Sequence, residues 1–518
     1  MSADEARALA GSAGDTVRAG APERWASAAA GQAATASDID LGVSADHTSA
    51  RGISLTVNLY QSAAVPHDVT IAWGDGTTET ASATGGDVLR FVKHAYPRPG
   101  DYTVTVTAVD SVSKVQAVKQ LAVSTSGSFF SPHAPTRLLD TRAGIGVGKA
   151  KIGAYSSTWV KIAGMGKVPA GVVAVVLNVT VTNTNAAGHI SAYPAGAKRP
   201  ESSNMNYVAG QTVANQVIVP VSGDGYVELY NGGWNSVDLI ADVTGYFHRS
   251  ADDGYTSLAP VRFVDTREGL GSRRSQVAGQ SAIGVQITGR SGVPAGASAV
   301  ALNVTVTNPR EAGHLTVFPA GQTAPSTSNL NFTAGQTIAN SVIVPVGPDG
   351  KINVRNGAWA GTDVIVDVVG YYGAGSKAAF STLGDGGMTS PWRIEDSRKL
   401  TGENSWLTLA GGYFFEPLVP MSNPRPIEAH VLNVTVTTTS GPGFLSVSPD
   451  PYPWERYRYE VPPKPPRPVS STLNWTAGKD VPNLVQAKPG PYGLVDFWNQ
   501  SSREADFIID WLGQYDAY

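Results

Sequence analysis

The chain contains the segment Leu177-Asn178-Val179-Thr180-Val181-Thr182, and the same six residues return at 302–307 and at 432–437. Apolar and polar residues alternate in this segment, which at the two-residue period of a strand places the apolar side chains on one face. The residues immediately before the first copy, Ala174-Val175-Val176, are all apolar, as expected where a strand enters a core that covers both of its faces. The segment therefore predicts a half-buried β-strand at the centre of three copies of one unit.

Other residues repeat with the same period. Asp140 is followed 125 residues later by Asp265, which is followed 131 residues later by Asp396. The offset between the second and third copies reaches 143 residues from Asn331 to Asn474, so the third copy contains an insertion before Asn474. This period is far above the roughly 20 to 50 residues of solenoid repeats. We therefore expect each copy to be a whole domain with its own core.

The composition indicates a turn-rich β protein, because 57 Gly and 34 Pro accompany many Val and Thr residues. Charged residues make up 15% of the chain and the net charge is −4, so no footprint for nucleic acid or an anionic membrane is present. The absence of cysteine excludes disulfides, thiolate metal sites and a cysteine nucleophile. No apolar run approaches the ~20 residues that cross a bilayer, so we predict no membrane insertion.

The first segment, residues 1–37, is rich in Ala, Gly and Ser and is predicted to be a disordered lead-in. It lacks the basic stretch and apolar region of a secretory signal. We expect either that the true start lies elsewhere or that the protein leaves its cell by another route. The predicted domains that follow are residues 38–125, 126–250, 251–375 and 376–518.

Three motifs in residues 38–125 are found in a known family. They are Trp73-Gly74-Asp75-Gly76-Thr77, His94-Ala95-Tyr96 and Pro99-Gly100-Asp101-Tyr102 with the alternating residues 103–106. In this order they resemble a PKD domain, an immunoglobulin-like sandwich common in extracellular proteins. Trp73 is expected in the core, and the hydroxyl of a tyrosine in these motifs is expected to tie a loop to the backbone. Asp75 is expected to cap its turn, with a calcium site as the alternative.

Each repeat is expected to form a two-sheet sandwich or jelly roll, with a closed barrel as the alternative. The fold class is therefore all-β, with tandem β-sandwich domains. Turn signals such as Gly223-Asp224-Gly225 separate the expected strands. In the first repeat these strands are 136–140, 157–162, 174–182, 189–193, 205–207, 213–221, 226–230 and 238–247.

The repeats resemble a module of actinobacterial exported proteins. The resemblance is carried by Asp140-Thr141-Arg142, the segment 177–182, Gly210-Gln211-Thr212-Val213-Ala214-Asn215 and Asp242-Val243-Thr244-Gly245-Tyr246. The second copy has all four motifs. The third departs from them at Lys479, Pro482 and Gln514, which puts any shared ligand site there in doubt. The resemblance implies a secreted location and no known activity.

Charged residues recur in all three repeats and are the best catalytic candidates. A carboxylate between two arginines is typical of a buried ion pair that joins the first and last strands of a sandwich, and breaking such a pair is costly. We therefore predict structural ion pairs and no catalytic residue, with a cation site built on the aspartates as the alternative. The residues are Arg137, Asp140, Arg142, Asp242, Arg262, Asp265, Arg267, Asp367, Arg393, Asp396, Arg398 and Asp510.

Two histidines, His189 and His314, occupy equivalent places after Ala-Gly, and the third copy has Phe444 there. Because a ring without a titratable nitrogen is accepted at this position, we expect the histidines to serve in packing.

The insertion of the third repeat, residues 451–470, contains seven prolines together with aromatic and basic side chains. Prolines stiffen such a loop, so exposed rings lose little entropy on binding, and rings beside cations suit sugars or proteins. A loop that covers its own domain is an equally weighted alternative. The ligand-binding residues predicted here are Tyr452, Trp454, Arg456, Tyr457, Arg458 and Tyr459.

The sequence as a whole predicts a non-catalytic extracellular binding or scaffold protein without a cofactor. Its expected partner is a polysaccharide or a protein at a cell surface. The alternatives are a structural protein of a phage virion and an accessory region of a secreted hydrolase. Because each repeat carries a complete set of strands, a fragment from Ser128 to Ser250 is expected to unfold cooperatively by itself.

Overall fold

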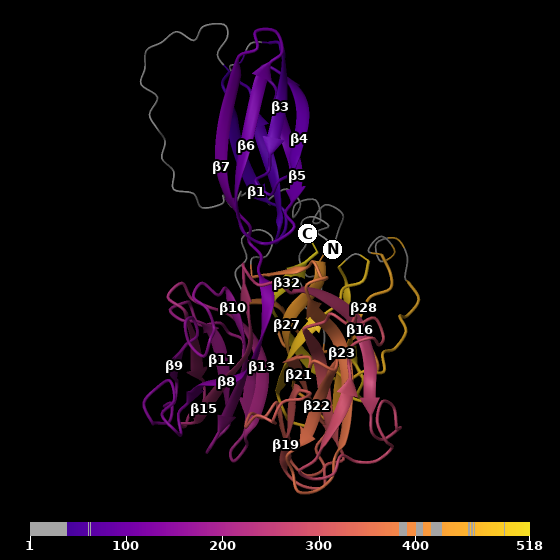
Figure 1. Cartoon of the computed structure of the whole chain (residues 1–518). Helices are drawn as coiled ribbons and strands as arrows, with labels where there is room; N and C mark the ends of the chain where they lie inside the picture. The colour runs from indigo at the N-terminus through magenta and orange to yellow at the C-terminus, as the bar shows by residue number, and fades with distance from the viewer. Residues whose placement is uncertain are drawn as a thin grey trace. The chain divides into compact units, whose positions relative to one another are not determined.

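The computed structural model describes residues 39–60, 62, 64–382, 391–399, 408–415, 427–453, 456, 459, 462–491 and 493–517 (Figure 1). The predicted lead-in, residues 1–37, lies outside this part of the chain. Two compact units are present, the first ending at Ser128 and the second beginning at Phe129. All the named elements are strands, which confirms the predicted all-β class.

The N-terminal unit is a sandwich of a three-stranded sheet, β1-β2-β5, and a four-stranded sheet, β4-β3-β6-β7. Its core alternates as the sequence predicts: Val104, Val106 and Ala108 are fully buried between half-buried threonines. The strands are β1 Gly42–His47, β2 Gly52–Asn58, β3 Pro66–Ala72, β4 Thr78–Thr84, β5 Val88–Ala95, β6 Asp101–Asp110 and β7 Gln116–Ser124.

The turn motif of this unit has the predicted roles. Trp73 is buried and stacks on His94 with ring centroids 4.5 Å apart. The carboxylate of Asp75 accepts hydrogen bonds from the backbone N–H of Thr77 at 3.0 Å and from its hydroxyl at 2.6 Å, and it contacts His94 at 2.8 Å. The hydroxyl of Tyr102 donates to the carbonyl of Arg98 at 2.8 Å. Asp75 therefore caps the turn.

The first repeat is a sandwich of two four-stranded sheets, β13-β10-β15-β8 and β12-β11-β14-β9. All eight predicted strands are present. The first begins at Phe129 rather than at residue 136, because residues 129–132 pair with the end of β15. The strands are β8 Phe129–Asp140, β9 Ser156–Lys161, β10 Ala174–Thr182, β11 Gly188–Pro194, β12 Met205–Tyr207, β13 Val213–Pro220, β14 Tyr226–Asn231 and β15 Asp238–His248.

The second repeat has the same topology, with sheets β16-β23-β18-β21 and β17-β22-β19-β20. Each sandwich of the C-terminal unit encloses its own apolar core. The strands are β16 Gly254–Asp265, β17 Ala282–Gln286, β18 Ala299–Thr307, β19 Gly313–Pro319, β20 Leu330–Phe332, β21 Ile338–Pro345, β22 Lys351–Asn356 and β23 Asp363–Gly373.

The third repeat keeps this plan, but its first strand is represented by two shorter ones, β24 and β25, that both pair with β32. Its sheets are β24-β32-β27-β30 with β25, and β26-β31-β28-β29. The strands are β24 Ala379–Ser381, β25 Trp392–Asp396, β26 Phe414–Phe415, β27 Ile427–Thr437, β28 Gly443–Pro449, β29 Leu473–Trp475, β30 Val481–Ala487, β31 Val495–Asn499 and β32 Asp506–Asp516.

The strand that contains Leu-Asn-Val-Thr-Val-Thr is buried on both faces, so the prediction of a half-buried strand is wrong. In β10 the side chains of Asn178 and Thr180 are almost as inaccessible as those of Leu177 and Val179. The apolar face packs inside its own sandwich, whereas the polar face lies against a neighbouring repeat. The alternation therefore separates two kinds of buried interface rather than core from solvent.

The asparagine of this strand links each repeat to the next. Asn178 donates to the carbonyl of Ser328 at 2.8 Å, Asn303 donates to Ser471, and Asn433 donates to Ser203 at 3.0 Å. The contacts run from the first repeat to the second, from the second to the third and from the third back to the first. The three repeats thus close a ring with pseudo-threefold order, and their strands lie side by side in Figure 1.

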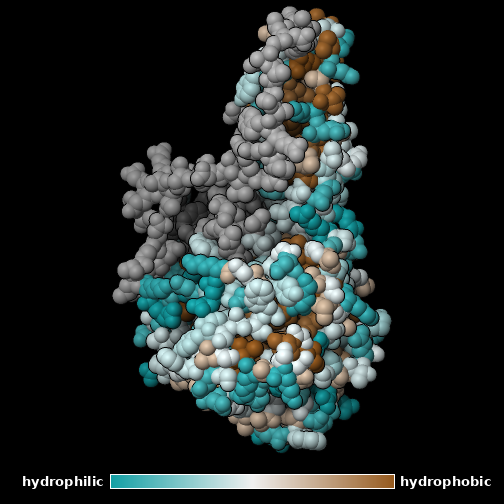
Figure 2. All heavy atoms as spheres, turned by 90° about the vertical axis from the view of Figure 1, so that its left-hand side faces the viewer, coloured by the Kyte–Doolittle hydropathy of each residue, from teal (hydrophilic) through white to brown (hydrophobic). Residues whose placement is uncertain are grey.

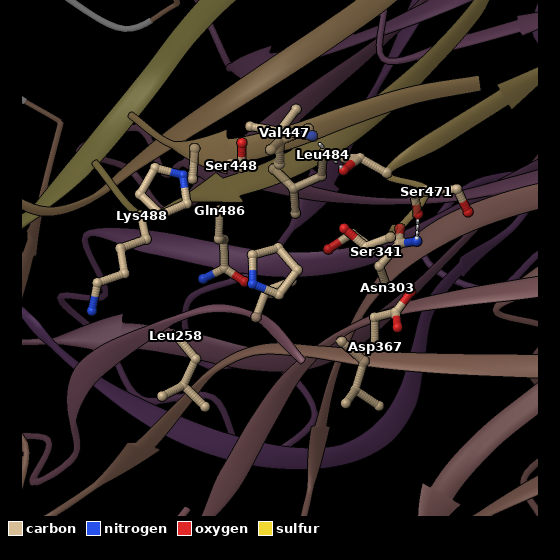
Figure 3. A pocket seen from close by; sticks show the side chains of 18 residues that line it. Leu258, Asn303, Ser341, Asp367, Val447, Ser448, Ser471, Leu484, Gln486 and Lys488 are labelled. Carbon is tan, nitrogen blue, oxygen red and sulfur yellow. Dashed lines mark hydrogen bonds between the residues drawn. The ribbon is translucent and has the colours of Figure 1, made fainter. Parts of the chain in front are cut away.

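Figure 3 shows one seam of this ring, with the bond from Asn303 to Ser471 between the second and third repeats. The cavity drawn there measures only about 20 Å³, which is room for little more than one water molecule. It is a packing gap at the seam rather than a ligand pocket.

A shared core of six aromatic rings lies where the repeats meet. Each pair of neighbouring repeats contributes one pair of stacked or tilted aromatic side chains, with ring centroids 4.1 to 4.4 Å apart. The hydroxyls of Tyr372 and Tyr515 lie 2.6 Å apart, and the amide of Gln486 donates to both. This packing argues against independently stable repeats. The rings belong to Phe130, Phe247, Tyr255, Tyr372, Phe380 and Tyr515.

Candidate functional site

The structure brings the predicted charged residues together in every repeat. In the first, the guanidinium of Arg137 lies 3.1 Å from Asp140 and 2.9 Å from Asp242, and Arg142 lies 2.7 Å from Asp140. The corresponding distances are 3.4, 2.9 and 2.7 Å in the second repeat and 3.4, 2.9 and 2.8 Å in the third. Arg137 thereby joins β8 to β15, the first and last strands of the sandwich.

The arginine equivalent to Arg137 also reaches a neighbouring repeat. Arg262 donates to the carbonyl of Val469 at 3.2 Å, and Arg393 donates to the carbonyl of Glu201 at 3.1 Å. These bonds follow the same cyclic order as the asparagine contacts. The arginine therefore contributes both to the closure of its own sandwich and to the ring of repeats.

The two carboxylates of each ion-pair cluster have opposite pKa shifts. Hydrogen bonds from Arg142 lower the pKa of Asp140, and those from Arg267 lower the pKa of Asp265. Burial raises the pKa of Asp242 above its usual range, and it does the same for Asp367 and Asp510. A pair of carboxylates with separated pKa values is also what acid–base catalysis requires, so the geometry must decide between the roles.

That geometry leaves no space for a substrate between the two carboxylates. Asp140 and Asp242 are both buried, and the guanidinium of Arg137 occupies the gap between them. The arrangement is suited to holding strands together.

The histidines are packed against glycines of the loop that follows the seventh strand of each repeat, β14 or β22. The ring of His189 occupies the space that a side chain at Gly232 would need, and His314 does the same at Gly357. Burial lowers the pKa of both imidazoles, and a nearby arginine lowers each further. Neutral, packed rings agree with the replacement by Phe444 in the third repeat.

A buried carboxylate in the third repeat was not singled out by the sequence. Glu395 takes the place of the core residues Leu139 and Val264, and its carboxylate oxygens have no hydrogen-bond partner among the described residues. Burial raises the pKa of this carboxyl to about 7. Folded protein therefore binds a proton that unfolded protein releases near pH 4.5.

Replacing Glu395 with Leu is expected to stabilise the protein increasingly as the pH rises. Because the pKa of Glu395 is raised in the folded protein, its contribution to stability is fully present below the unfolded-state pKa of 4.5. That contribution is lost as the pH rises through the folded-state pKa of about 7. The stability of the variant relative to the natural chain should thus rise by about 3 kcal/mol between pH 4.5 and pH 8. Urea unfolding of both proteins from pH 4.5 to 8 measures this difference. A difference that does not change with pH contradicts the prediction.

Part of the proline-rich insertion covers its own domain. Pro465 is buried, and the ammonium group of Lys464 lies 5.2 Å from the ring of the buried Trp498 and donates to the carbonyl of Gly412 at 2.8 Å. Arg467 bonds to Gln500 on the same domain. The described residues 462–470 thus favour a loop that covers its own repeat.

The predicted ligand-binding residues of the insertion are only partly described. Trp454, Tyr457 and Arg458 lie outside the described residues. Arg456 is exposed and stands over the ring of the half-buried Tyr452 at 5.4 Å. Tyr459 is 75% exposed. The binding role of these six residues stays a prediction.

Two exposed tryptophans were missed by the sequence analysis. Trp234 and Trp359 are 77% and 83% exposed, and they occupy equivalent positions after a tight turn in the first and second repeats. The side of the C-terminal unit visible in Figure 2 is mostly hydrophilic or neutral, with hydrophobic colour confined to small patches. The signal available in the sequence was the recurrence of Trp after Asn-Gly at an interval of 125 residues.

A depression of about 860 Å³ lies where the three repeats meet. It is lined by residues of the Gly-Gln-Thr-x-Ala-Asn segment of the first repeat, of the equivalent segments 335–340 and 478–483, and of the stretches just before them. Trp234 also lines it. The underlying strands β13, β21 and β30 contact one another, and Asn340 on β21 donates to the carbonyl of Ala214 on β13 at 2.6 Å.

The described residues show two further negative findings. They contain no group of three or more His, Cys, Asp or Glu side chains placed to hold a metal ion. Nor do they contain a helix of the length and apolarity needed to cross a membrane.

Comparison with known families identifies the first unit. Residues 40–123 match the family model of the PKD domain, so this part of the chain is a PKD domain, as its motifs indicated. The match ends before the repeats begin. No match was found among curated proteins.

Similarity to solved structures is weak. A chain of Sulfolobus Turreted Icosahedral Virus aligns with 78% of this chain and 88% of its own length, at 9% identity and a TM-score of 0.14. A chain of E. coli alpha-2-macroglobulin aligns with 86% of this chain and 27% of its own, at 10% identity and a TM-score of 0.13. With scores this low, the role of the repeats is argued from their residues alone.

Proposed function

We propose that this protein is a non-catalytic extracellular binding or scaffold protein whose partner is a polysaccharide or a protein at a cell surface. The observation that carries the proposal is the combination of a PKD domain with three sandwiches closed into one unit. PKD domains are binding or spacer modules of extracellular proteins. A ring of repeats that bond to one another supplies a rigid body on which a binding surface can be held.

The charged residues support a non-catalytic role. Asp140 and Asp242 are the repeated titratable pair, and both are engaged with Arg137 inside the domain. A catalytic carboxylate has to reach its substrate at hydrogen-bonding distance. The same buried arrangement in three copies is better explained by the stability of each sandwich.

The intact chain is expected to sediment with insoluble cell-wall polysaccharide and to release neither sugars nor peptides from it. Sedimentation is measured with increasing amounts of wall material, and the supernatant is assayed for reducing ends and free amines. Boiled protein serves as the control for non-specific adsorption. Release of products would favour the accessory region of a hydrolase, and failure to bind wall polysaccharide or wall protein would contradict the proposal.

A further inference from the structure

We propose that the depression at the meeting point of the three repeats binds a neutral oligosaccharide, with one sugar ring stacked on the indole of Trp234. This inference rests on the proposed function as a cell-surface binding protein and names its site and ligand class. The volume of about 860 Å³ lies in the range of known small-ligand sites. A short oligosaccharide is of suitable size for it.

The aromatic wall of the depression is held in place by a second ring. Tyr155 packs edge-on against Trp234 with the ring centroids 5.2 Å apart, and it fixes the orientation of an indole that is largely exposed. An exposed, oriented indole offers an apolar face to the C–H groups of a sugar at little entropic cost. A large aromatic side chain in such a position is also the usual anchor of a binding site.

The second repeat lacks this pair, so the site is asymmetric. At the position of Tyr155 it has Gln280, whose amide donates to the carbonyl of Gly357 at 2.7 Å and accepts from Arg355 at 2.6 Å. Gln280 therefore gives the exposed Trp359 no aromatic partner of the kind that Tyr155 gives Trp234. Trp359 is also not among the residues that line the depression. Trp359 provides a matched control.

The charge of the lining favours a neutral ligand. Among the lining residues, Lys479 and Asp480 are charged side chains of opposite sign that follow one another in the chain. His189 also lines the depression, and burial lowers its pKa, so the imidazole is neutral at pH 7. A polyanionic glycan would need several cations that the lining does not supply.

The polar groups of the lining suit hydroxyl-rich ligands. The side-chain oxygens of Gln211 and Gln336 accept bonds from the backbone N–H groups of Val208 and Thr333, at 3.1 and 3.0 Å, which fixes both amides at the rim. The side-chain oxygens of two lining residues, Asn215 and Asn474, are buried without a hydrogen-bond partner among the described residues. Unmet buried acceptors are uncommon, and because these two oxygens are inaccessible beneath the lining, ordered water rather than the ligand would satisfy them.

The test is calorimetric titration of the intact protein with neutral tetrasaccharides of glucose, N-acetylglucosamine, xylose and mannose. At least one is expected to bind, and Trp234→Ala should raise its Kd by about ten-fold or more. Trp359→Ala, outside the lining, should leave the Kd unchanged. Because Trp234 is largely exposed, its replacement should not change the melting temperature, which is measured in parallel.

Three results would overturn the assignment. They are unchanged binding by Trp234→Ala, an equal loss with Trp359→Ala, and binding of acidic glycans alone with dependence on Lys479. If no tetrasaccharide binds although the intact chain sediments with cell-wall material, the site is wrong and the proposed function stands. If neither binding is seen, both are wrong.

Discussion

A fragment limited to residues 129–250 is expected to aggregate or to remain without cooperative unfolding, although it contains every strand of the first sandwich. In the complete unit Phe130, Val176, Ile218 and Phe247 are almost fully buried in the core that the three repeats share. The isolated fragment would expose these side chains together as one apolar patch, which a soluble monomer rarely tolerates. This reverses the expectation drawn from the strand set alone.

Sedimentation velocity and urea unfolding of the fragment measure this effect. A fragment of residues 39–128 is the control, because the PKD domain encloses its own core and should unfold cooperatively. A fragment of residues 129–517 should also do so, since it retains all three repeats. A monomeric first repeat that unfolds at the same urea concentration as the longer fragment would show that the shared core contributes little.

Replacing Asp140 with Asn is expected to lower the free energy of unfolding by ~3 kcal/mol. The carboxylate accepts bonds from Arg142 at 2.7 and 2.9 Å and from Arg137 at 3.1 Å, and it is only 3% exposed. Its loss leaves two guanidinium groups with one carboxylate, Asp242. Chemical unfolding of the full chain, followed by tryptophan fluorescence, measures the change.

The pH dependence of this variant gives a second readout. The pKa of Asp140 is lowered in the folded protein, so its contribution to stability is present above the unfolded-state pKa near 3.8. That contribution is lost as the pH falls through the lower folded-state pKa. The difference between the natural chain and Asp140→Asn should therefore be constant at neutral pH and shrink in acid. Asp349→Asn, at an exposed pair with Lys351, should cost less than about 1 kcal/mol. Unchanged stability together with lost ligand binding would instead revive Asp140 as a site residue.

Local features of the fold were accessible from the sequence because they depend on near neighbours in the chain. The alternation in residues 103–106, the turn at Asp75 and the eight strands of the first repeat follow from strand period and turn chemistry. The ion pairs were found through their repetition at a fixed interval.

The arrangement of the repeats was not accessible in this way. Asn215 donates to the carbonyl of Pro482, 267 positions away, and no local pattern indicates such a contact. Asn178 and Thr180 were assigned to solvent because polar residues in a strand usually face water. Both are buried, Asn178 against Ser328 of another repeat, which is a tertiary effect that overrides this preference.

The candidate site was hidden for the same reason. Trp234 is visible in the sequence as one tryptophan beside a turn, but the depression that it lines is made by segments of all three repeats. The insertion at 451–470 drew attention because its composition is unusual. Its described end, residues 462–470, instead contacts its own domain and, through Val469, the second repeat.

The cyclic order of the asparagine contacts limits how such a gene can change. Each repeat uses one surface to donate and a different one to accept, and the third repeat returns its donor, Asn433, to the first. In an open array of tandem repeats, the two end repeats each have one unpaired contact surface, so recombination can add or remove repeats. In a closed ring every donor surface is already paired with an acceptor surface. A duplicated fourth unit would find its place occupied, and deletion of one would leave the shared aromatic core open. The copy number of three is therefore a property of the fold, and divergence of individual repeats is the remaining route to new function.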